Sequence, residues 1–74
     1  MNAQVNNIRS PDALLIAADF IRLNGPDGRA VARANARTDG TWDVRAPDGN
    51  WTNTSEAIAH KLMQAHAIAY ALGA

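Results

Sequence analysis

The residues from Arg29 to Trp51 (RAVARANARTDGTWDVRAPDGNW) constrain the fold more than any other part of this chain. They combine a two-residue alternation of alanine with mostly polar residues, two Asp-Gly pairs and both tryptophans. A period of two is typical of a β-strand with one buried face, and Asp-Gly between such runs is typical of a hairpin turn. The segment therefore predicts a three-stranded antiparallel meander.

The first run, 29–37, admits a second interpretation. Alanine and arginine both favour helices, so local propensity alone predicts a helix there. The alternation favours a strand, and so does the turn at Asp39-Gly40, which leads directly into Trp42.

The register of the first hairpin depends on the length of its loop. A two-residue loop would place Arg37 opposite Trp42 and mix polar with apolar side chains. A three-residue loop, with Gly40 in the left-handed conformation, places Ala36 opposite Trp42 and Ala34 opposite Val44. Only the second register leaves one buried and one solvated face, so we predict it.

The second turn, Pro47 to Asn50, is compatible with two registers. A four-residue loop pairs Ala46 with Trp51 and keeps Trp51 on the same face as Trp42. A three-residue loop moves Trp51 to the face that carries the arginines. Both registers stay open at this point.

Two helices are expected to flank the meander. Ser10-Pro11-Asp12 has the composition of a helix start, and Gly25-Pro26 would end that helix near Asn24. Leu14, Ala17, Ala18 and Ile21 would share its buried face, and Asp19 and Arg22 would pair on its polar side.

The second helix is expected to begin in the run Asn53-Thr54-Ser55-Glu56, with Asn53 or Thr54 as its N-cap, and to end at Gly73. Its buried stripe would consist of Ile58, Leu62, Ala65, Ala69 and Leu72. His60 would face solvent.

These elements describe the α+β class, with one small domain over 10–74 in the order α-β-β-β-α and both helices packed on one face of a three-stranded antiparallel sheet. Residues 1–9 are expected to form a loose N-terminal arm. A chain of 74 residues buries only about 60% of the surface that its unfolded form exposes, so its core is small. The absence of cysteine excludes disulfide bonds and thiolate metal sites.

No residue pattern indicates catalysis, a metal or a cofactor. The 2 histidines, His60 and His66, would project about 120° apart on a helix and could not share a metal ion. Both serines fit helix starts, and the aspartates of the turns fit their local hydrogen bonding. We therefore expect a protein that is not an enzyme and has no cofactor.

The best candidate for a functional surface is the polar face of the meander. Arg33, Arg37 and Arg45 would lie on it, with Arg29 at its end, and Trp51 would join them if the second loop has three residues. One interpretation is an ordinary solvated surface neutralised by Asp43. The other is a contact surface for phosphates or for an acidic patch of a protein, because tryptophan and arginine dominate the energetics of interfaces.

The segment Thr41 to Leu62 (TWDVRAPDGNWTNTSEAIAHKL) is similar to a ββα module of small bacterial and phage proteins. The whole chain, which is short and cysteine-free and has no enzyme signature, resembles the anti-CRISPR proteins of phages and prophages. That resemblance implies a cytoplasmic inhibitor that evades host defence by binding a subunit of a type I CRISPR effector and blocking DNA recognition or nuclease recruitment. The chain departs from the acidic DNA-mimicking members, because its 7 basic residues balance its 7 acidic ones.

Two other functions are compatible with the sequence. The protein could bind nucleic acid through the arginine-bearing face, although its neutral net charge provides no overall attraction for phosphates. It could instead be a phage structural or assembly subunit that dimerises through its apolar helices. We expect a monomer or a weak homodimer, with no membrane segment.

Overall fold

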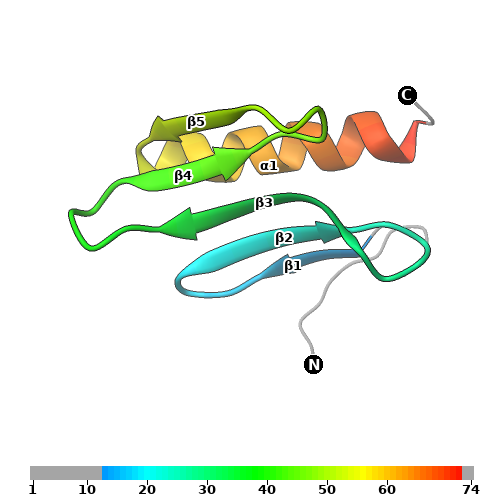
Figure 1. The fold of residues 1–74 in the computed structure, drawn as a ribbon, viewed down its shortest axis with the longest axis horizontal. Helices are drawn as coiled ribbons and strands as arrows, with labels where there is room; N and C mark the ends of the chain where they lie inside the picture. Colours follow the sequence, from blue (N-terminus) through cyan, green and yellow to red (C-terminus); the bar gives the residue numbers. More distant parts are fainter. Residues whose placement is uncertain (1–12, 73–74) are drawn as a thin grey trace.

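The computed structural model describes residues 13–72, which form five β-strands followed by one α-helix. The elements are β1 (Ala13–Ile16), β2 (Phe20–Asn24), β3 (Ala30–Ala36), β4 (Trp42–Arg45), β5 (Trp51–Thr54) and α1 (Glu56–Ala71). All strands belong to one antiparallel sheet in the order β1-β2-β3-β4-β5. The helix lies along one face of the sheet (Figure 1), where it packs on β2, β3 and β4.

The predicted order α-β-β-β-α, with three strands and two helices, is therefore wrong. Residues 13–24, which we expected to be helical, form the β1–β2 hairpin. The proposed helix start at Ser10 and the N-terminal arm over 1–9 lie outside the described residues.

The sequence of this hairpin explains the error, because it satisfies two periodicities at once. Nearly every residue from Ala13 to Phe20 is apolar, so a helical stripe can always be drawn through it. Ile21 and Leu23 also alternate with Arg22, and both are buried on the face that α1 covers. Pairing with β3 buries these two side chains, and such tertiary contacts override a weak helical propensity.

Three of the four hairpins close with the same type of loop. The loops between β2 and β3, β3 and β4, and β4 and β5 each have three residues and end in a glycine with φ of 83°, 89° or 92°. In each loop an aspartate accepts a hydrogen bond from the backbone N–H two residues later, at 3.0, 2.9 and 3.0 Å for Asp27, Asp39 and Asp48. The first loop, within Asn24 to Gly28, is therefore a hairpin turn rather than a connection between a helix and a strand.

The loop lengths decide both registers. Ala36 lies opposite Trp42 and Ala34 opposite Val44, which confirms the predicted three-residue loop with a left-handed Gly40. The second loop also has three residues, because Arg45 rather than Ala46 lies opposite Trp51.

The two tryptophans consequently lie on opposite faces of the sheet. Trp42 is 3% exposed in the core, whereas Trp51 is 56% exposed on the face away from α1.

The core lies between the sheet and the helix. Its buried residues are Ile21, Leu23, Ala32, Ala34, Trp42 and Val44 from the sheet and Ala59 and Met63 from the helix. The small side chains of Ala32, Ala34 and Ala59 allow α1 to approach the sheet closely.

The N-cap of the helix lies one or two residues later than predicted, and the helix is rotated about its axis relative to the prediction. Ser55, rather than Asn53 or Thr54, is the N-cap, and its Oγ accepts a hydrogen bond from the N–H of Ile58 at 3.3 Å. The buried stripe is centred on Ala59 and Met63, whereas Ile58 and Leu72 of the predicted stripe are 44% and 80% exposed. The error arose because this helix has apolar residues on two faces, with Ile58, Ile68 and Leu72 on the exposed one.

Candidate functional site

The face of the sheet opposite α1 carries a lateral row of side chains, one from each strand. Each side chain of this row lies opposite the next one across a strand pair, in the order Leu15, Arg22, Arg33, Arg45 and Trp51. We call Arg22, Arg33 and Arg45 the arginine row; Trp51 lies at its β5 end.

The arginine row places three arginines at directly opposed positions of adjacent strands. Adjacent strands are about 4.8 Å apart, so the Cα atoms of the row span only about 10 Å. Like charges directly opposite each other destabilise a sheet. Within residues 13–72, none of the salt bridges joins an arginine of the row to an acid. The row is thus a local excess of positive charge that an external anion would neutralise.

A second lateral row lies beside the first, formed by Phe20, Asn35, Asp43 and Asn53. Its acid, Asp43, accepts hydrogen bonds from Asn53 Nδ2 at 3.0 Å and from Arg37 Nη1 at 2.9 Å. The hydrogen bond from Asn53, and then the one from Arg37, hold the pKa of the Asp43 carboxyl below its usual value. Asp43 is therefore neutralised by Arg37 and not by the arginine row.

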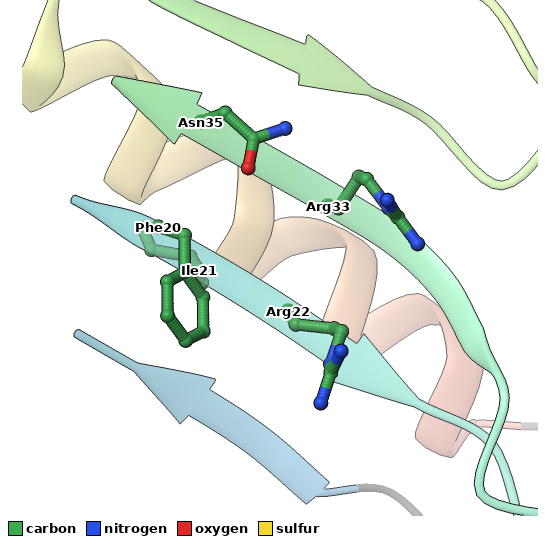
Figure 2. A pocket seen from close by; sticks show the side chains of 5 residues that line it. All are labelled: Phe20, Ile21, Arg22, Arg33 and Asn35. Atoms are coloured by element: carbon green, nitrogen blue, oxygen red, sulfur yellow. The ribbon is translucent and has the colours of Figure 1, made fainter.

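Where the two rows cross β2 and β3, their side chains border an open hollow of about 200 Å³. Its lining residues are Phe20, Ile21, Arg22, Arg33 and Asn35. Figure 2 shows the ring of Phe20, both guanidinium groups and the amide of Asn35 on the near side of the strands, with the helix behind them. The hollow thus combines an aromatic wall, two cations and one amide.

The structure brings together three of the five candidate site residues: Arg33, Arg45 and Trp51. Arg37 follows β3 and forms a salt bridge with Asp43. A second acid, Asp39, lies with its Oδ2 at 3.8 Å from Arg37 Nε. Arg29 follows the β2–β3 loop, immediately before β3, where its 87% exposed side chain pairs with Asp27 at 3.6 Å.

Arg22 and Phe20 were missed, because both were assigned to a helix. Arg22 does not pair with Asp19, as the helical interpretation proposed, and lies on the open sheet face opposite Arg33. The alternation in Phe20–Asn24 (FIRLN) is the signal that could have identified both residues.

The histidines form no site with each other. His60 is half-buried rather than solvated, its ring centroid lies 5.7 Å from that of Trp42, and its Nε2 is 3.8 Å from Glu56. His66 is also half-buried.

Residues 13–72 lack two further features. This part of the chain contains no cluster of three His, Cys, Asp or Glu side chains that could hold a metal ion. It also contains no helix with the length and apolar character needed to cross a membrane.

Comparisons with known proteins identified no family. The chain matches no protein-family model, and no curated protein or solved structure is significantly similar to it.

Proposed function

We propose that this protein binds nucleic acid, with the phosphate backbone held on the arginine row. The observation that carries the proposal is the direct opposition of Arg22, Arg33 and Arg45 across three adjacent strands. Guanidinium groups bind phosphate oxygens through pairs of N–H donors, and a row of them matches a chain of phosphates.

The neutral net charge does not oppose this proposal, because several of the acids either lie in hairpin loops or are engaged by residues outside the arginine row. Asp27, Asp39 and Asp48 each accept a backbone hydrogen bond in a hairpin loop. Asp43 is engaged by Arg37 and Asn53. A chain with no overall charge therefore has one sheet face with an excess of arginine, and binding depends on this local field.

Binding of a fluorescently labelled oligonucleotide, followed by anisotropy at low salt, tests the proposal. Arg33→Glu reverses the central charge of the row and should abolish binding. Arg29→Glu makes the same charge change at an exposed position next to the β2–β3 loop, where Arg29 pairs with Asp27, and should leave most of the affinity. No binding by the unmodified protein at 20 mM NaCl, or equal loss in both variants, would refute the proposal.

A second candidate is the inhibitor implied by the resemblance to anti-CRISPR proteins. The observation that favours it is the exposed Trp51 directly opposite Arg45. Tryptophan and arginine are the most frequent hot-spot residues of protein interfaces. In this function the same face would cover a surface of a type I CRISPR effector subunit that otherwise binds DNA or recruits the nuclease.

Size-exclusion chromatography with a type I effector complex tests the second candidate. Co-elution that Trp51→Ala abolishes would support it, with Ile68→Ala on the outer face of α1 as the control. Clean separation at micromolar concentration would count against it.

A further inference from the structure

We propose that the hollow between β2 and β3 receives one unstacked base of a single-stranded nucleic acid, with Phe20 stacking on the base and Asn35 contacting its edge. This inference rests on the proposed function, because the arginine row would hold the adjoining phosphates. It adds the class of nucleic acid and the position of one base.

The shape of the sheet favours a single strand over a duplex. Five adjacent strands span about 19 Å, whereas the major groove of DNA is about 12 Å wide and the minor groove about 6 Å. The arginine row lies on β2, β3 and β4, in the middle of the sheet rather than at an edge that could enter a groove. A flexible single strand can lie across such a face.

Aromatic side chains lie at two places next to the arginine row. Trp51 lies opposite Arg45 and is exposed, and Phe20 precedes Arg22 by two residues on the same side of β2. Single strands are typically bound by a positively charged track in which successive bases stack on aromatic rings. Phe20 and Trp51 would supply two stacking positions, one beside the β2 end and one at the β5 end of the arginine row.

The lining of the hollow matches the parts of one nucleotide. Arg22 and Arg33 line one side of it, and Phe20 and Asn35, which lie opposite each other across β2 and β3, line the other. The guanidinium groups would bind a phosphate, the ring would cover a base, and the amide would donate to and accept from the base edge (Figure 2). A side-chain amide forms its best paired hydrogen bonds with adenine, so we expect a preference for that base.

The inference is tested by anisotropy with labelled 12-mers of oligo(dA), oligo(dT) and a duplex of the same length. Phe20→Leu keeps an apolar side chain and removes the ring, and should weaken binding of oligo(dA) about tenfold. Asn35→Ala should remove the preference for oligo(dA) over oligo(dT). Ile68→Ala, on the exposed outer face of α1, should change neither, and thermal melts followed by circular dichroism establish that each variant is folded.

The outcomes separate this inference from the proposed function. Equal affinity for single strand and duplex, unchanged binding by folded Phe20→Leu, or a preference for oligo(dA) that survives Asn35→Ala would overturn the base site while leaving phosphate binding intact. Absence of binding to every oligonucleotide at low salt would instead refute the proposed function and, with it, this inference.

Discussion

Arg33 lies directly opposite Arg45 across the β3–β4 pair, and no acid pairs with either side chain within residues 13–72. Arg33 also lies opposite Arg22 on its other side. A central strand position thus carries a charge with a like charge on both flanks. Such an arrangement opposes folding of the free protein and favours binding of an anion.

The first prediction concerns stability without a ligand. Replacing Arg33 by threonine, a good strand former, should raise the free energy of unfolding by about 0.5 kcal/mol, because it relieves both like-charge contacts. Urea denaturation at low salt, followed by circular dichroism, measures this change.

The control for this prediction is Arg29→Thr, because Arg29 lies beside Asp27 and not in the row. Its free energy of unfolding should rise less than that of Arg33→Thr, because Gly25 rather than an arginine lies across from Arg29. Added NaCl should stabilise the unmodified protein more than Arg33→Thr, since salt screens the repulsion. A clear loss of stability in Arg33→Thr would show that repulsion among the arginines of the row does not destabilise the free protein.

The second prediction concerns pH. Hydrogen bonds hold the pKa values of Asp39 and Asp43 below the usual range. A carboxyl with a lowered folded-state pKa contributes stability that is present above its unfolded pKa, about 3.9, and is lost as the pH falls through the folded value. The urea midpoint should therefore be constant near neutral pH and fall below about pH 4.

Asp43→Asn isolates the part of this effect that comes from Asp43. The substitution removes the charge that Arg37 contacts at 2.9 Å. The variant should lose less stability than the unmodified protein between pH 5 and pH 2.5. Parallel pH profiles for the two proteins would show that Asp43 makes no such contribution.

The third prediction concerns the contact between the helix and the β2–β3 loop. A Cβ atom on Gly25 would lie 2.9 Å from Tyr70 Oη and 3.3 Å from Val31 Cγ1. Gly25→Ala should therefore destabilise the protein by about 1–3 kcal/mol through overpacking.

A double-mutant cycle with Tyr70→Phe tests the cause of that loss. Removing the hydroxyl leaves room for the new methyl group, so Gly25→Ala should cost less in the Tyr70→Phe background than in the unmodified protein. Chemical denaturation of all four proteins gives the coupling energy. Strict additivity would indicate that α1 does not approach Gly25 in this way.

The fourth prediction uses the two tryptophans as reporters. Trp42 is 3% exposed and Trp51 is 56% exposed, so the variant Trp42→Phe should emit at a longer wavelength than Trp51→Phe. Single-stranded DNA should quench the emission of Trp42→Phe and leave that of Trp51→Phe nearly unchanged. Identical spectra for the two variants would contradict the three-residue loop that places Trp51 on the open face.

Much of the meander could be predicted because local chemistry and side-chain alternation agree there. Gly40 allows one loop geometry, and that geometry places Ala36 opposite Trp42 as expected. The length of the second loop could not be predicted, since both the three-residue and the four-residue register leave Ala46 and Trp51 in plausible surroundings.

The N-terminal hairpin could not be predicted, because its apolar residues satisfy a helix and a strand equally well. The deciding contacts are between Ile21 and Ala34 and between Leu23 and Ala32 on β3, which local propensity does not contain. Arg22 was lost from the candidate site with this error. The buried face of the helix was also predicted wrongly. The helix α1 packs on the sheet through Ala59 and Met63, which are small or flexible, whereas the β-branched Ile58 remains exposed.

The central claim, that the arginine row binds phosphates, is tested most directly by the salt dependence of binding to a single-stranded oligonucleotide. Three phosphate contacts predict a slope of about −2 in a plot of the logarithm of the association constant against the logarithm of the salt concentration. Each substitution of Arg22, Arg33 or Arg45 by alanine should make the slope less negative by about 0.7, whereas Arg29→Ala should leave it unchanged. A slope near zero for the unmodified protein, or one that the three substitutions do not alter, would contradict the claim.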